Sequence, residues 1–94
     1  MIELNKLETA SEMLKAIAHP IRIAVVGMLD DNKKLSVTEI HETLNIEQAV
    51  ASHHLSILKN KGVLLSERSG KNCYYSLKHQ RLSQILDCID KCQH

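Results

Sequence analysis

Hydrophobic residues recur at helical spacing along most of this 94-residue chain. Positions i, i+3, i+4 and i+7 share one face of a helix, so such stripes predict amphipathic helices. Five helices are predicted in this way, over residues 4–17, 20–30, 37–44, 48–60 and 79–92. The second of these is apolar nearly all round, which indicates a central, buried helix.

Residues 63–77 change to a strand-like composition. Two short runs, Val63–Arg68 and Cys73–Leu77, flank the turn sequence Ser69-Gly70-Lys71-Asn72, which predicts a β-hairpin with a basic tip. The fold class is therefore mainly α with a small β-hairpin, in the order α-α-α-α-β-β-α. At this length, residues 1–94 are expected to form a single domain.

Local signals mark where the central helices begin and end. His19-Pro20 interrupts the first stripe, and proline suits a helix start. Ser36 and Glu39 have the spacing of a capping box, and Gly62 follows the fourth helix as a glycine C-cap.

The stretch from Ser36 to Lys59 predicts a helix-turn-helix. In its second helix, residues 48–60, one side is apolar and carries Ala51, Leu55, Leu58 and His54, whose ring we expect to be packed and bonded to the backbone. The other side has no carboxylate and carries Gln48, Ser52, His53, Ser56 and Lys59. An acid-free, hydrogen-bonding face suits the major groove of DNA, which makes this the recognition helix. The hairpin that follows is then a wing, whose tip is placed to touch phosphate or the minor groove.

Charge is distributed unevenly, although the formal net charge is only +1. Residues 1–47 hold five cationic and eight acidic side chains, whereas residues 48–81 hold six cationic side chains against Glu67 alone. The basic stretch coincides with the predicted recognition helix and wing. We therefore expect double-stranded DNA as the partner.

Size and composition favour a homodimer. A chain this short buries little apolar surface, and the stripes on the first and last helices have no evident partner within it. We expect both helices to pair with their mates across a two-fold axis through leucine and isoleucine side chains: Leu4, Leu7, Leu14, Leu82, Ile85, Leu86 and Ile89.

The three cysteines are an odd number in a chain without a signal-peptide pattern or an apolar run long enough for a membrane span. We therefore expect a cytoplasmic protein with reduced thiols and no membrane partner. Cys88 and Cys92 are four residues apart on the last predicted helix and are candidate sensor thiols for a soft metal, an oxidant or reactive sulfur. Cysteine as a plain apolar filler is the alternative.

The chain resembles the ArsR/SmtB family of winged-helix repressors, and specific residues carry the likeness. Leu14–Arg22 resembles the motif L-x-x-L-A-x-P-x-R, and Ser52–Lys59 is similar to the recognition-helix motif S-x-H-L-x-x-L. Gly62–Leu77 resembles the wing motif G-L-V…R-x-G-R-x-x-Y-x-L. The likeness covers nearly the whole chain in order.

That resemblance implies a homodimeric repressor that a chemical signal releases from an inverted-repeat operator. It implies that the recognition helix contacts DNA through Gln48, Ala49, Val50, Ser52, His53, Ser56 and Lys59. The implied wing contacts are Arg68, Ser69, Gly70, Lys71 and Asn72.

The resemblance does not extend to metal sensing. The positions of the family's Cys-Val-Cys motif hold Ser36 and Thr38, and the start of its terminal-helix metal site holds His79 and Arg81. We therefore expect neither metal site and no cofactor, and the inducer stays open between thiol chemistry, a small molecule and none.

Two other functions have less support in the sequence. An enzyme is not expected, because the sequence has no phosphate-binding glycine loop and no ordered nucleophile, base and acid. A winged-helix module that binds protein instead of DNA is the alternative function. The absence of acidic residues from the recognition face argues against it.

Overall fold

The computed structural model describes residues 3–82 and 84. The elements follow the predicted order, with one addition. Four helices, α1 (Leu4–Ile17), α2 (Pro20–Met28), α3 (Val37–Leu44) and α4 (Gln48–Asn60), precede the hairpin of β2 (Leu64–Ser69) and β3 (Asn72–Leu77). The addition is the short strand β1 (Leu35–Ser36). The winged helix-turn-helix fold is thus confirmed, while most of the predicted last helix lies outside the described residues.

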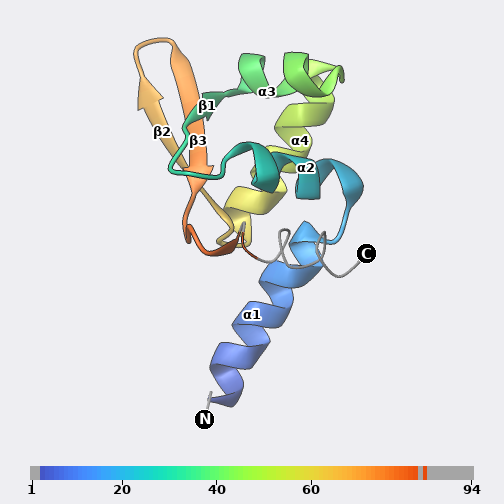
Figure 1. Ribbon diagram of the computed structural model, residues 1–94, viewed down its shortest axis with the longest axis vertical. Coiled ribbons are helices and arrows are strands. Elements are labelled where there is room, and N and C mark those ends of the chain that lie inside the picture. Colours follow the sequence, from blue (N-terminus) through green and yellow to red (C-terminus); the bar gives the residue numbers. More distant parts are fainter. Residues whose placement is uncertain (1–2, 83, 85–94) are drawn as a thin grey trace.

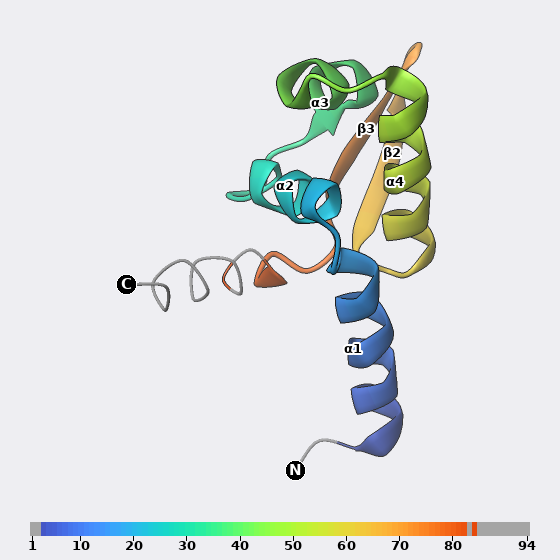
Figure 2. The same ribbon diagram turned by 90° about the vertical axis from the view of Figure 1, so that its right-hand side faces the viewer.

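The body of the fold places α2, α3 and α4 beside the hairpin, and α1 projects away from them (Figures 1 and 2). The core lies where these elements meet. Its fully buried side chains are aliphatic: Val25, Val26, Leu29, Ile40, Leu55, Leu58, Val63 and Leu64. Each such residue contributes about 1.5–3 kcal/mol relative to an exposed position. The core therefore fixes α4 against both α2 and the base of the wing.

The sheet has three strands in the order β1-β3-β2, all antiparallel. β1 pairs with the middle of β3, where Leu35 lies opposite Tyr75 and Ser36 opposite Tyr74. The sequence did not predict this strand, because two residues are too short to show a period. Its pairing attaches the start of α3 directly to the wing.

Two further expectations need correction. α2 ends at Met28 and is not buried all round: Val25 and Val26 face the core, but the Ile23 side chain is 38% exposed. The wing strands each extend one residue farther toward the tip than predicted, so that Ser69 pairs with Asn72. The turn is therefore Gly70-Lys71 alone, with Gly70 at a positive φ of 62° in its first position, where glycine stands in a type II′ turn.

Candidate nucleic-acid interface

The helix-turn-helix begins with the predicted capping box. The backbone N–H of Glu39 donates to Oγ of Ser36 over 3.1 Å, and the backbone N–H of Ser36 donates to Oε1 of Glu39 over 3.1 Å. Two backbone donors at the start of α3 are thereby satisfied. α3 ends at Leu44, and its C-cap Asn45 has a left-handed φ of 55° that turns the chain toward α4.

α4 ends in a Schellman motif around Gly62. The N–H of Val63 donates to the carbonyl of Leu58 over 2.9 Å, and the N–H of Gly62 donates to the carbonyl of Lys59 over 3.1 Å. Gly62 has a φ of 80°, a conformation that favours glycine. The expected glycine C-cap is confirmed, and it directs the chain from α4 into β2.

The two sides of α4 differ in burial, as the sequence pattern predicts. Ala51, His54, Leu55 and Leu58 are buried on the inner side. The outer side presents Gln48, Ala49, Val50, His53, Ser56 and Lys59 as exposed residues, with Ser52 half-buried. The 13-residue helix therefore offers solvent a continuous face without a carboxylate.

His54 is buried as expected, but its ring bonds to a side chain and not to the backbone. Its Nδ1 accepts a hydrogen bond from Nε of Arg22 on α2 over 3.1 Å, and its ring lies 4.6 Å from that of His19. Burial, followed by the charges of His19, Arg22 and His53, lowers the pKa of His54 below its ordinary value. No local signal could reveal this partner, since 32 residues separate Arg22 from His54.

The wing carries its predicted DNA contacts on the surface. All five tip positions are exposed: Arg68, Ser69, Gly70, Lys71 and Asn72. The single acid of this region, Glu67, is paired with Lys34, whose Nζ lies 2.9 Å from Glu67 Oε2. That hydrogen bond, and then the charge of Lys34, lowers the pKa of the Glu67 carboxyl. Lys34 thus counters the one negative charge on the wing.

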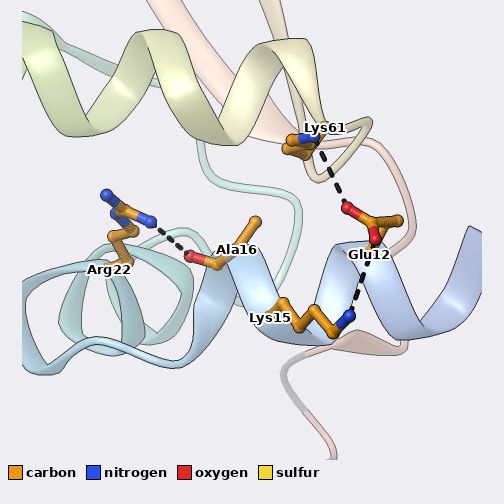
Figure 3. Close-up of polar contacts among 5 residues, drawn as sticks. All are labelled: Glu12, Lys15, Ala16, Arg22 and Lys61. Carbon is orange, nitrogen blue, oxygen red and sulfur yellow. Dashed lines mark hydrogen bonds and ion pairs between the residues drawn. The ribbon is translucent and has the colours of Figure 1, made fainter.

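One cation of the basic stretch has a partner within the fold. Lys61 lies at the end of α4, where its Nζ is 3.5 Å from Oε2 of Glu12 on α1. Figure 3 shows Glu12 between Lys61 and Lys15, with Arg22 reaching the carbonyl of Ala16 near the end of α1. Three other cations border the exposed face and form no ion pair within the described part of the chain: Lys59, Arg68 and Lys71.

The predicted dimer residues differ in exposure. On α1, the side chains of Leu4, Leu7 and Leu14 are 72%, 46% and 49% exposed. Leu82 is partly buried against the core and, together with Met13 and Leu14, lines an apolar cavity of about 290 Å³. The remaining predicted residues, Ile85, Leu86 and Ile89, and both candidate sensor thiols, Cys88 and Cys92, lie outside the described residues.

The described part of the chain has no candidate metal site. No group of three or more His, Cys, Asp or Glu residues within 3–82 and 84 has the geometry to hold a metal ion. Ser36 serves as the cap of α3, while His79 and Arg81 line the apolar cavity. Within the described part, no helix has both the length and the apolar character needed to cross a membrane.

Comparisons with known proteins agree with this geometry. A family model described as a helix-turn-helix domain matches residues 17–67, which contain α2, α3 and α4. The transcriptional repressor PagR of Bacillus anthracis is 36% identical over 98% of this chain and 92% of its own length. The repressor SmtB of Mycobacterium tuberculosis is 40% identical over 88% of this chain, which spans only 62% of that protein.

Solved structures show the same fold. The crystal structure of PagR superposes with a TM-score of 0.82, covering 93% of this chain and 99% of that one. HlyU from Vibrio cholerae, 26% identical, also gives a TM-score of 0.82 and covers 97% of both chains. Proteins of this kind are transcriptional regulators and not enzymes. With a winged helix-turn-helix, a matching domain model and repressors as relatives over nearly its full length, the chain belongs to the ArsR/SmtB family of DNA-binding transcriptional regulators.

Proposed function

We propose that this protein is a cytoplasmic, homodimeric repressor that binds an inverted-repeat operator and leaves it on a chemical signal. The observation that carries the proposal is the exposed, acid-free face of α4 beside an exposed basic wing. A duplex presents phosphates on both sides of its major groove, and such a surface complements both the groove and its edges.

Each element has a separate role in this proposal. Gln48, Ala49, Val50, Ser52 and His53 face the base edges, while Ser56 and Lys59 lie nearer the sugar-phosphate backbone. Arg68 and Lys71 hold the phosphates that flank the groove. In a two-fold dimer, the recognition helices enter successive major grooves about 34 Å apart.

Selection from a pool of random duplexes tests sequence-specific binding. Purified protein is incubated with the pool at about 150 mM salt, a physiological ionic strength, and the bound duplexes are sequenced. We expect enrichment of one motif repeated about a two-fold axis. Retention without any enriched sequence would reject a specific operator, and no retention at low salt would favour a protein-binding module.

Two substitutions separate base reading from phosphate binding. Lys71→Ala should weaken binding to all duplexes alike and lower the salt slope, by about 0.9 for each phosphate that the variant no longer neutralises. Gln48→Ala should instead reduce the preference for the selected duplex over a random one. Lys6→Ala, at the far end of α1, is the control for the removal of a positive charge. Equal losses on both duplexes for Gln48→Ala would contradict its role in base reading.

The releasing signal is tested at the two thiols that lie outside the described residues. Affinity for the selected duplex is measured on reduced protein, then with Zn(II), Cu(I) or a persulfide donor, for the parent and for Cys88→Ser/Cys92→Ser. A tenfold loss in the parent alone, about 1.4 kcal/mol of coupling, would identify these thiols as the sensor. An unchanged affinity would direct the search to non-thiol ligands.

A further inference from the structure

Arg22 connects the end of α1 to the middle of the recognition helix. Its Nη1 donates to the carbonyl oxygen of Ala16 over 3.0 Å, and its Nε donates to Nδ1 of His54 over 3.1 Å. Ala16 is the next-to-last residue of α1, where carbonyl groups lack partners within the helix. A single half-buried guanidinium therefore satisfies the end of one helix and holds a side chain of another.

The bond to Arg22 requires a neutral His54. Arginine can only donate, so Nδ1 of His54 must be unprotonated and its ring hydrogen must lie on Nε2. His54 is 8% exposed, so a proton on Nδ1 would abolish the bond and leave two cations in contact within the fold. This polar link therefore exists only in the neutral state of the ring.

The surroundings of His54 offer no compensation for a positive charge. His19 and Arg22 face it from the start of α2, and His53 is its neighbour on α4, with ring centroids 5.5 Å apart. On α1, Glu12 forms ion pairs with Lys15 and with Lys61 at the end of α4. The charged residues of α3 and β2 are all exposed: Glu39, Glu42, Glu67 and Arg68. On α3, Nδ1 of His41 lies 3.2 Å from the carbonyl oxygen of Ile46.

We propose that Arg22 is a positioning residue for DNA binding, which orients α4 relative to α1 through its hydrogen bond to neutral His54. Protonation of His54 breaks this hydrogen bond and frees α4 from that orientation. The inference rests on the proposed DNA-binding function. His53 on the exposed face directly precedes His54, so a rotation of α4 that frees His54 also displaces the reading face. The exposed Glu12–Lys61 pair is a weak substitute for this bridge.

The direction of the pH effect follows from the lowered pKa of His54. The neutral ring is favoured in the folded protein, so the hydrogen bond is complete at a pH above 6.5, the ordinary pKa of histidine. It is lost as the pH falls through the lower pKa that His54 has in the folded protein. DNA affinity should therefore decline in acid through this residue. A variant that lacks only the titration of His54 is needed to isolate this effect.

The test compares the parent with His54→Asn, whose amide oxygen can accept from Arg22 but takes up no proton. Dissociation constants for the selected duplex are measured by fluorescence anisotropy at constant salt, from about pH 8 down to the lowest pH at which both proteins stay folded by circular dichroism. Relative to His54→Asn, the parent should lose about tenfold in affinity across this range, as expected when a charged hydrogen bond is broken. His41→Gln controls for the loss of a histidine elsewhere in the helix-turn-helix.

Arg22→Lys and a DNA-free measurement complete the experiment. Lysine keeps the charge but lacks the planar guanidinium whose N–H groups reach two acceptors. This variant should therefore bind the selected duplex weakly at pH 8 and show a flatter pH profile. Nitrogen-15 NMR of the His54 ring should show the Nε2–H tautomer in the parent and a tautomer mixture in Arg22→Lys. Circular dichroism confirms that each variant is folded.

Identical pH profiles for parent and His54→Asn would overturn the proposal, as would a protonated Nδ1 at pH 8. If no duplex is enriched in the selection, the proposed function fails and Arg22 has no role in DNA binding. The ring measurement would then still show whether the bridge exists, so the two failures can be told apart.

Discussion

Two residues with positive φ stand in the turns before and after the recognition helix. Asn45, at 55°, turns the chain after α3, and Gly62, at 80°, closes α4 and leads into β2. At Gly62 the space beside the backbone is open, since an added Cβ would meet nothing within 4 Å. The requirement at Gly62 is therefore purely one of backbone conformation.

Gly62→Ala isolates that requirement. Because the space is open, the cost should be that of a left-handed L-residue, about 1–2 kcal/mol of unfolding free energy. Urea denaturation at constant protein concentration measures the loss. Gly62→Asn is the matched control, since asparagine tolerates this conformation, and it should lose less. Equal losses for both variants would show that the added side chain and not φ is responsible.

At the scale of elements, the wing depends on a residue outside it. Glu67 is the only acid between residues 48 and 81, and Lys34, just before β1, is paired with it over 2.9 Å. The pair is exposed, so it contributes little to the stability of the fold. Its consequence for DNA is larger, because an uncountered carboxylate on the wing would repel phosphate.

Lys34→Ala should therefore reduce affinity for the selected duplex several-fold without changing the unfolding midpoint. Removing the hydrogen bond and charge of Lys34 should also return the pKa of Glu67 upward toward its ordinary value, which carboxyl NMR can follow. In the double variant Lys34→Ala/Glu67→Gln, affinity should equal that of Glu67→Gln alone. If it stays lower, Lys34 contacts DNA directly.

The elements were predictable from sequence to the extent that their signals are local. Helical periodicity located α3 and α4, and the capping box and Gly62 marked their ends within a residue. β1 was missed because its two residues become a strand only by pairing with β3, about 40 positions later. The predicted partner of His54 was wrong for the same reason, since Arg22 comes from a distant helix. The exposure of Ile23 depends on packing and not on composition.

At the scale of the whole molecule, α1 is the least enclosed helix of the described chain. It projects from the body, and of its fourteen residues only Ala16 and Ile17 are buried. Its leucines Leu4, Leu7 and Leu14 are exposed, and Leu14 lines the apolar cavity together with Met13 and Leu82. A second copy of the chain would cover this surface in the proposed dimer.

The double variant Leu7→Glu/Leu14→Glu should shift the protein from twice the chain mass of 10.6 kDa to a single chain mass in sedimentation equilibrium. Each buried leucine contributes about 1.5–3 kcal/mol, so losing two weakens association at least about a hundredfold. Lys6→Gln, which lowers the charge of α1 by one as each leucine substitution does, should leave the mass unchanged. A parent that sediments as one chain would reject the dimer.

The pairing of β1 with β3 also delays folding during synthesis. Leu35 leaves the ribosome 40 residues ahead of its partner Tyr75, a delay of about 2–8 s at the usual rates of translation. Val63, Leu64 and Leu77 of the core arrive late as well. The apolar sides of the nascent helices therefore stay exposed during this delay. The recognition helix and wing become rigid only when β3 has emerged.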